Sequence, residues 1–171
     1  KTVDGIKHTY TLDETKILRE TWDDNTIVPL YDNEESVCGI LYNSVPYYFI
    51  KNLQGDVIAI VDKDAKTVAR YSYDAWGTPE IKFDSSECQI ATVNPFRYRG
   101  YYYDEEIELY YLQSRYYNPT WGRFINADSY ASTGQGFVGY NMFAYCNNNA
   151  INLADASGSR SQVCIDDQFN P

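Results

Sequence analysis

The chain has 171 residues, a length that fits one domain with a sizeable buried core. Its net charge of −10 argues against a nucleic-acid partner and against anionic membranes, because phosphate binding needs clustered Lys and Arg. The 18 Tyr against 7 Phe favour thin sheets over a thick globular core, since a buried tyrosine hydroxyl needs a polar partner.

The first half of the sequence repeats itself. An Asp or Asn follows a β-rich run at positions 13, 32, 52 and 74, so the steps are 19, 20 and 22 residues. Such a period indicates a unit that stacks on copies of itself, and two strands with two turns fit the length. The copies at Asp13 and Asp32 lack the glycine that follows Asp74, and we expect them to be degenerate.

Residues 48–74 form the clearest unit. Val57, Ala59 and Val61 alternate with other residues as in a strand, and Asn52 and Asp62 begin turns on either side. Residues 14–22 have a helix-compatible composition, but their place within a repeat favours a turn followed by a strand. The sequence therefore predicts antiparallel hairpins throughout this half.

Residues 94–128 carry the most informative run. Apolar and aromatic residues recur there at largely two-residue spacing, which is typical of strands with one buried face: Tyr101, Tyr103, Leu109, Tyr111, Tyr116 and Phe124. Turn-forming residues interrupt the run near Asp104 and Asn118. Two hairpins are expected, with turns at these two positions.

This run resembles the core segment of the rearrangement-hotspot (Rhs) or YD-repeat family. The matching stretches are NPFRYRGYYYD from Asn94, LYYLQSRYYNP from Leu109 and GRFI from Gly122, followed by Asp128. NMFAYCNNN from Asn141 and DASG from Asp155 are similar to the family's final landmarks, and the sequence YDAWG from Tyr73 is similar to a YD repeat.

The resemblance implies a fold and a division of the chain. The expected fold class is all-β, with antiparallel β-hairpin YD repeats forming part of a spiralling β-sheet shell. Residues 1–93 would be degenerate YD repeats, 94–158 the Rhs-repeat-associated core segment and 159–171 a C-terminal tail. The chain is expected to begin within a longer protein, because Lys1 starts neither an initiator sequence nor a signal peptide.

Three functions are compatible with this resemblance. The first is a structural shell that encloses and helps deliver a toxin polypeptide located C-terminally. The second is an aspartyl-type self-cleaving element acting near Gly158, and the third is a surface module that binds carbohydrate or another cell. The expected partners are the rest of the shell or another chain at open strand edges, and an enclosed toxin. The expected location is outside the cell or at the bacterial cell surface.

In toxin-bearing members of the family, two acidic residues are implied to cut the peptide bond after the final landmark. Asp128 and Asp155 match these acids, and Arg115 or Arg123 would tune them electrostatically. Two close carboxylates share one proton, so one can act as an acid while the other activates water. The family's prolines are replaced by Ser129, Ala150 and Ala156, which loosens these turns and favours an inactive copy.

Other sites find little support. The cysteines at 38, 88, 146 and 164 show no C-x-x-C spacing and the chain has one histidine, so neither a metal site nor a cofactor is expected. Free thiols are favoured, although a disulfide stays possible in a secreted protein. In the tail, Val163, Ile165 and Phe169 are expected to pack against the inner face of the sheet.

Overall fold

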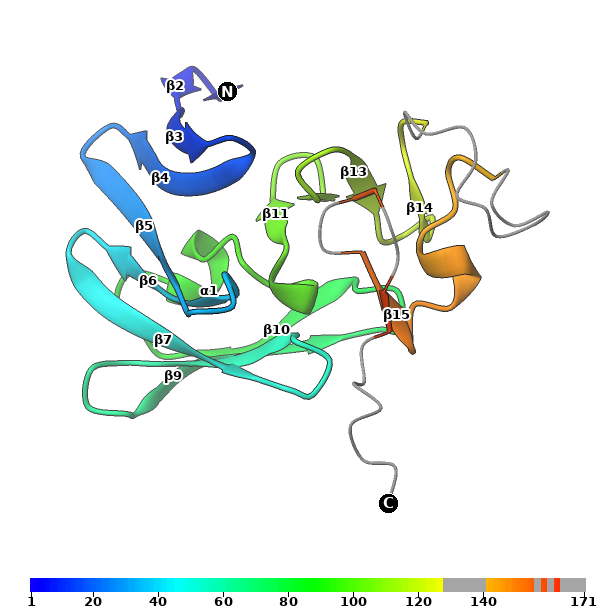
Figure 1. Ribbon diagram of the computed structural model, residues 1–171. Coiled ribbons are helices and arrows are strands. Elements are labelled where there is room, and N and C mark those ends of the chain that lie inside the picture. The colour runs from blue at the N-terminus through cyan, green and yellow to red at the C-terminus, as the bar shows by residue number, and fades with distance from the viewer. Residues whose placement is uncertain (128–140, 156–157, 160–161, 164–171) are drawn as a thin grey trace.

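The computed structural model describes residues 1–127, 141–155, 158–159 and 162–163. Antiparallel strands dominate, as the sequence predicted. The largest sheet is a meander in which each strand pairs with the next one in the chain (Figure 1). Its strands are β3 (Thr9–Asp13), β4 (Lys16–Trp22), β5 (Asn25–Tyr31), β6 (Val37–Tyr42), β7 (Val45–Lys51), β8 (Val57–Val61), β9 (Thr67–Tyr73) and β10 (Pro79–Asp84).

The remaining elements are short. A hairpin precedes the large sheet, and a second sheet of four strands follows it at the other side of the molecule in Figure 1. These elements are β1 (Thr2–Val3), β2 (Ile6–Lys7), α1 (Ile90–Val93), η1 (Tyr98–Gly100), β11 (Tyr102–Asp104), β12 (Leu109–Tyr111), β13 (Tyr116–Asn118), β14 (Arg123–Phe124), η3 (Cys146–Asn148), β15 (Leu153–Ala154) and β16 (Gln162–Val163).

The predicted hairpin turns near Asn52, Asp62, Asp74, Asp104 and Asn118 are all present, each between two paired strands. The repeat spacing is confirmed as well. One step covers two strands and two turns, so the turns that begin at positions 13, 32, 52 and 74 all lie at the same end of the antiparallel sheet.

Four turns share one hydrogen-bond pattern, in which the side-chain oxygen of the first residue accepts the backbone N–H groups of the third and fifth residues. The first residues are Asp32, Asn52, Asp62 and Asp74. This is the Asx-turn chemistry that makes Asp and Asn frequent turn residues. We call these four segments the Asx turns.

The fourth residue of every Asx turn has a positive φ. Gly55 (88°) and Gly77 (92°) adopt it freely, whereas Glu35 (62°) and Ala65 (60°) hold it against the steric preference of their β-carbons. The copy at Asp32 is therefore degenerate in sequence but keeps the turn. The turn after Asp13 is different, because Asp13 pairs directly with Lys16 across a two-residue connection.

One face of the large sheet is covered by the segment that follows it. Ile40 and Ile60 are fully buried on this face, where they belong to one apolar cluster with Ile90 of α1 and Phe96. Burial of this apolar surface stabilises the packing of residues 90–102 against the sheet.

The small sheet departs from the predicted one-sided burial. Tyr111 and Tyr116, which the alternation placed inside, are only half-buried, whereas their neighbours Tyr110 and Tyr117 are completely buried. Both faces of this sheet are packed: Tyr102 belongs to the apolar cluster of the large sheet, whereas Tyr103, Tyr110 and Tyr117 belong to a second cluster. The hydroxyls of Tyr110 and Tyr117 find backbone acceptors in the large sheet's last turn. Period-two alternation cannot reveal a two-sided sheet of tyrosines.

Candidate functional site

Arg115 lies at the centre of the region that the sequence marked as a cleavage site. Its guanidinium donates hydrogen bonds to Asp155 Oδ2 (3.3 Å), to the carbonyl of Met142 (3.1 Å) and to the carbonyl of Gly158. The guanidinium also stacks over the ring of Phe124, 3.5 Å from its centroid. Arg115 thus joins three segments of the core region in a buried position.

Asp155 is held from several sides and is 2% exposed. Besides Arg115, its carboxylate accepts the backbone N–H of Ser159 (3.0 Å), and its own N–H donates to the hydroxyl of Tyr101 (3.0 Å). A carboxylate paired with a guanidinium and an amide is stabilised in its ionised form.

Gly158 needs to be a glycine here. Its φ is +70°, and an added β-carbon would lie 2.5 Å from the carbonyl oxygen of Leu112. Gly158 is therefore seated closely against the segment between β12 and β13. Arg115 bonds to Gly158, and the Asp155 carboxylate accepts the N–H of Ser159.

The structure brings together two of the four predicted site residues. Arg115 and Asp155 form an ion pair, as an electrostatic role for Arg115 requires. Arg123 lies elsewhere: its side chain is exposed on β14, and its guanidinium lies 5.8 Å from the centroid of the Phe143 ring. Asp128 lies outside the described residues, so the pairing of two acids stays a prediction.

The partners of Arg115 were not anticipated from the sequence. Met142, Phe124 and Tyr101 contact this pair from separate segments. All three lie in stretches that match the family, but nothing in those stretches indicated that they meet. The strand pair β15 and β16 places the backbone of residues 162–163 beside residues 153–154. The side chain of Val163, together with Ile165 and Phe169, lies outside the described residues.

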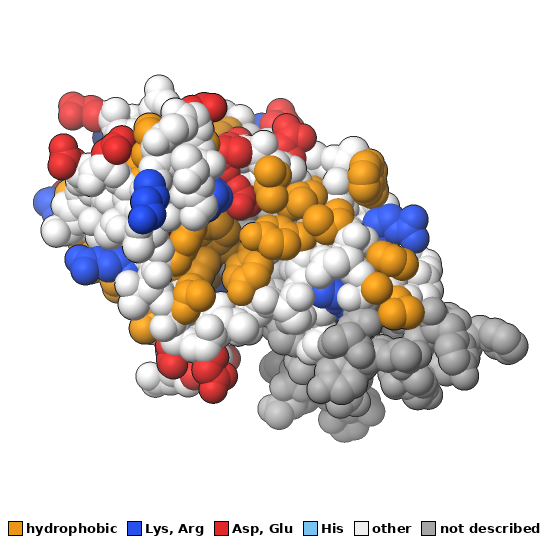
Figure 2. All heavy atoms as spheres, turned by 90° about the horizontal axis from the view of Figure 1, so that it is seen from above, with side chains coloured by type: hydrophobic (Ala, Val, Ile, Leu, Met, Phe, Trp, Pro, Cys, Tyr) orange, Lys and Arg blue, Asp and Glu red, His pale blue; other side chains and the backbone are white. Residues whose placement is uncertain are grey.

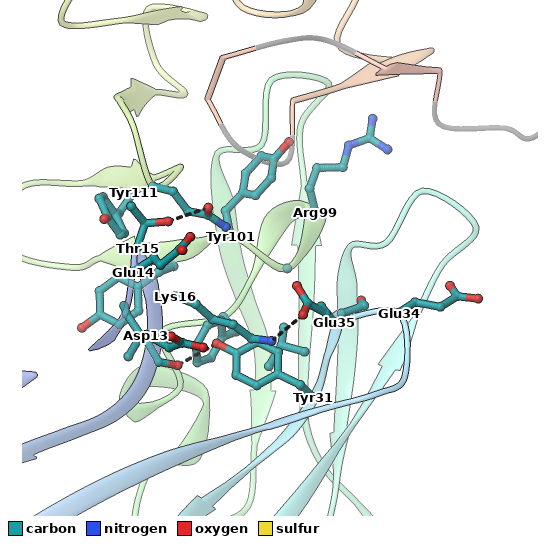
Figure 3. A pocket seen from close by; sticks show the side chains of 17 residues that line it. Asp13, Glu14, Thr15, Lys16, Tyr31, Glu34, Glu35, Arg99, Tyr101 and Tyr111 are labelled. Carbon is teal, nitrogen blue, oxygen red and sulfur yellow. Dashed lines mark hydrogen bonds and ion pairs between the residues drawn. The ribbon is translucent and has the colours of Figure 1, made fainter. Parts of the chain in front are cut away.

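A separate cavity of about 570 Å³ lies between the sheet and the core segment. The turns after β3 and β5 form one side of it, and residues 99–102, Tyr111 and Gln113 form the other. Figure 3 shows Thr15 and Lys16 directed toward the cavity and the Arg99 side chain directed away from it. The Lys16 ammonium lies 4.0 Å from the centroid of the Tyr31 ring and 3.9 Å from Glu35.

The cavity is rich in carboxylates. Asp13, Glu14, Glu34 and Glu35 line it. This charge favours a cationic over an anionic ligand. Across the described parts of the chain, no three His, Cys, Asp or Glu side chains are grouped to hold a metal ion.

The aromatic residues offer little support for a carbohydrate site. Tyr101, Tyr102, Tyr103, Tyr110 and Tyr117 are buried, so their rings cannot stack on a sugar. Trp121 is 69% exposed, and Figure 2 shows hydrophobic side chains gathered across the middle of one face of the molecule. Exposed apolar patches can mark contacts with other polypeptides as well as ligand sites.

Within the described ranges, the helices are too short or too polar to cross a membrane.

A protein-family model described as the teneurin YD-shell matches residues 15–151. The chain is 40% identical over 162 residues to the tRNA3(Ser)-specific nuclease WapA of Bacillus spizizenii and to the tRNA nuclease WapA of Bacillus subtilis. Each match covers 92% of this chain and 7% of the relative. The chain thus spans a small part of these curated relatives.

Solved structures share the fold. A crystal structure of TcdB2-TccC3-Cdc42 matches 82% of this chain and 7% of its own, with a TM-score of 0.69 and 22% identity. The Photorhabdus luminescens Tc holotoxin pore matches 94% of this chain and 7% of its own, with a TM-score of 0.67 and 19% identity.

Proposed function

This chain belongs to the teneurin YD-shell family, and we propose that it closes one end of a larger YD-repeat shell around a polypeptide cargo. The chain itself is a structural segment of such a shell. Its repeats form the wall, and residues 94–158 act as a core segment that packs on one face of the wall. The division at residues 93 and 158 is part of this proposal.

One observation carries the proposal. The eight-stranded sheet is a meander whose first strand, β3, has its outer edge unpaired among the described residues, while the other end leads into the core segment. An unpaired edge exposes backbone N–H and C=O groups that can accept a further strand. The preceding repeats of a longer chain are the proposed partner of this edge.

The exposed apolar residues support an assembly of this kind. Leu12 (49% exposed) and Ile107 (52% exposed) lie in the first strand of the sheet and in the turn after β11. In a larger shell such residues are covered by neighbouring segments. The structural relatives include a TcdB2-TccC3-Cdc42 structure and a Tc holotoxin pore, which agrees with this proposal. Secretion or display at the cell surface belongs to the same proposal.

The test uses the longer protein that contains this segment with its preceding repeats and following residues. Limited proteolysis should leave the polypeptide after residue 171 intact in the native protein and digest it after mild denaturation. Equal digestion before and after denaturation would contradict an enclosed cargo. Electron microscopy should show a hollow particle in the same sample.

Self-cleavage remains a second candidate because Arg115 and Asp155 contact Gly158 and Ser159, where the cut is expected. The contacts favour a holding role, since the Asp155 carboxylate is already occupied by Arg115 and by a backbone amide. We therefore propose that both residues fix the turn at the end of the core segment.

A further inference from the structure

The core segment contacts two successive Asx turns through adjacent residues of η1. The backbone N–H of Arg99 donates to Asp56 Oδ1 (3.0 Å), and the Arg99 guanidinium donates to the carbonyl of Gln54 (2.8 Å), so Arg99 contacts the turn that begins at Asn52. Tyr98 contacts the next turn at this end of the sheet, which begins at Asp74. The two turns are one repeat apart.

Three tyrosine hydroxyls bind the Asp74 turn. The Tyr98 hydroxyl lies 3.3 Å from the carbonyls of both Ala75 and Ala150. Tyr117 donates to the carbonyl of Trp76 (2.7 Å) and Tyr110 to that of Gly77 (2.8 Å). Three consecutive backbone carbonyls of this turn thus lie within hydrogen-bond distance of tyrosine hydroxyls, and the one at Gly77 is buried. The described contacts of the turns at Asp32 and Asp62 contain no tyrosine hydroxyl of the core segment.

The same turn requires glycine for a reason beyond its φ. A β-carbon at Gly77 would lie 2.5 Å from the ring of Tyr98. A β-carbon at Gly55, in the turn one repeat earlier, would meet only the Cα of Arg99 at 4.0 Å. The two glycines have nearly the same φ, so they differ mainly in the contact with the tyrosine ring.

The geometry points to a recognition surface on the core segment, made by Tyr98, Tyr110 and Tyr117, for an Asx turn whose fourth residue is glycine. This surface selects the Asp74 turn and so fixes the repeat at which the sheet ends. The turns at Asp32 and Asp62 lack this glycine. The Asn52 turn has Gly55, but it carries Gln54 at the third position, where the Asp74 turn has Trp76. The role of this surface in ending a shell wall rests on the proposed function, whereas the contacts between the tyrosines and the Asp74 turn do not depend on it.

The Trp76 side chain makes a second contact that distinguishes the Asp74 turn from the other Asx turns. Its ring lies so close to Gly122 that a β-carbon there would be 2.9 Å from it. The turn between β13 and β14 therefore receives the tryptophan of the selected turn, while the tyrosines bind its backbone. An Asx turn without a flat side chain at its third position leaves this contact unfilled.

Hydrogen exchange on the complete chain tests the inference with two matched glycine variants. Gly55→Ala carries the backbone strain alone, and strands β11–β14 should keep their protection relative to β5–β8. Gly77→Ala carries the same strain plus the clash, and β11–β14 should lose protection selectively, by about tenfold or more. Equal effects of the two variants on β11–β14 would overturn the inference.

A second pair of variants covers the case in which Gly77→Ala does not fold. Tyr110→Phe and Tyr117→Phe keep the packed rings and remove only the hydroxyls, and each should lower protection of β11–β14 by about tenfold with β5–β8 unchanged. Tyr116→Phe, in the same sheet, is the control and should change nothing. Unchanged exchange in both test variants would also overturn the inference. Proteolysis that contradicts an enclosed cargo would overturn the proposed function but would not change the expected exchange of these variants.

Discussion

Lys1 Nζ lies 2.7 Å from Asp104 Oδ1 and, at the same distance, from Glu106 Oε2, so a single ammonium joins the first residue to the turn between β11 and β12. Burial and the neighbouring Glu106 raise the pKa of Asp104 to about 6. Burial alone would raise the pKa of Glu106, but hydrogen bonds with Asp104 and Lys1 outweigh it and lower that pKa to about 2.

The stability of the protein should therefore increase on mild acidification. The raised pKa of Asp104 means that its contribution is fully present below its ordinary value of 3.8 and is lost as pH rises through about 6. The lowered pKa of Glu106 gives a contribution that is present above 4.5 and lost as pH falls through about 2. Both contributions are largely present near pH 4, and the Asp104 contribution is partly present at pH 5.

Urea denaturation at pH 5 and pH 7 measures this effect. The free energy of unfolding should be about 1 kcal/mol higher at pH 5, and Asp104→Asn should remove most of the difference. Asp24→Asn, in an exposed turn, should leave the difference intact. A pH dependence that survives Asp104→Asn would show that other groups cause it.

Placing glycine at the positive-φ position of an Asx turn that lacks it should stabilise the sheet. Ala65 has a φ of 60°, which costs a residue with a β-carbon about 1 kcal/mol or more. Ala65→Gly should raise the free energy of unfolding by about 1 kcal/mol. Ala75→Gly, in the Asp74 turn at a position without positive φ, is the control and should lower it. Thermal or urea denaturation gives both values, and a loss in Ala65→Gly would contradict the strain argument.

Buried Glu20 should be essential for docking the first strands on the core segment. Its carboxylate accepts hydrogen bonds from Tyr10 (3.0 Å) and Tyr102 (2.8 Å) and lies 2.8 Å from His8 Nδ1. Glu20→Ala leaves these buried groups without their acceptor and should cost about 2 to 4 kcal/mol of unfolding free energy. Glu80→Ala breaks an exposed ion pair with Lys82 and should have no measurable effect. Similar losses in both variants would contradict this role.

Removing the ion pair between Arg115 and Asp155 should destabilise the core segment and leave the chain length unchanged. Asp155→Asn should lower the unfolding free energy by about 2 kcal/mol or more, because the buried guanidinium loses its counter-charge. Asp23→Asn, in an exposed turn, should have little effect. Intact-mass measurement should find the unmodified protein uncut, and a product ending near Gly158 that disappears in Asp155→Asn would establish self-cleavage instead.

The sequence predicted the parts of the fold that depend on a few neighbouring residues. An Asx turn is completed by bonds within five residues, so the turns at Asn52, Asp62 and Asp74 could be placed from Asp, Asn and Gly alone. The strands between them followed from alternation. The helical turn α1 (Ile90–Val93) has only four residues and no periodic signal, and it was not foreseen.

The candidate site was less accessible from the sequence. Arg115 and Asp155 are 40 residues apart, and their contact depends on how the core segment folds back on itself. The family resemblance named these two residues, but it also named Arg123, which the structure places on the exposed side of β14. The roles of the tyrosines depend on distant carbonyl groups, which no local pattern encodes.

The most direct test of the shell assignment is amide hydrogen exchange in β3. Residues 9–13 should exchange rapidly at the outer edge in the 171-residue chain and become protected when the preceding repeats are present, because a further strand pairs with that edge. The inner strands β5–β8 should exchange alike in both proteins. Unchanged exchange of β3 in the longer protein would contradict the claim that this chain is one segment of a continuous wall.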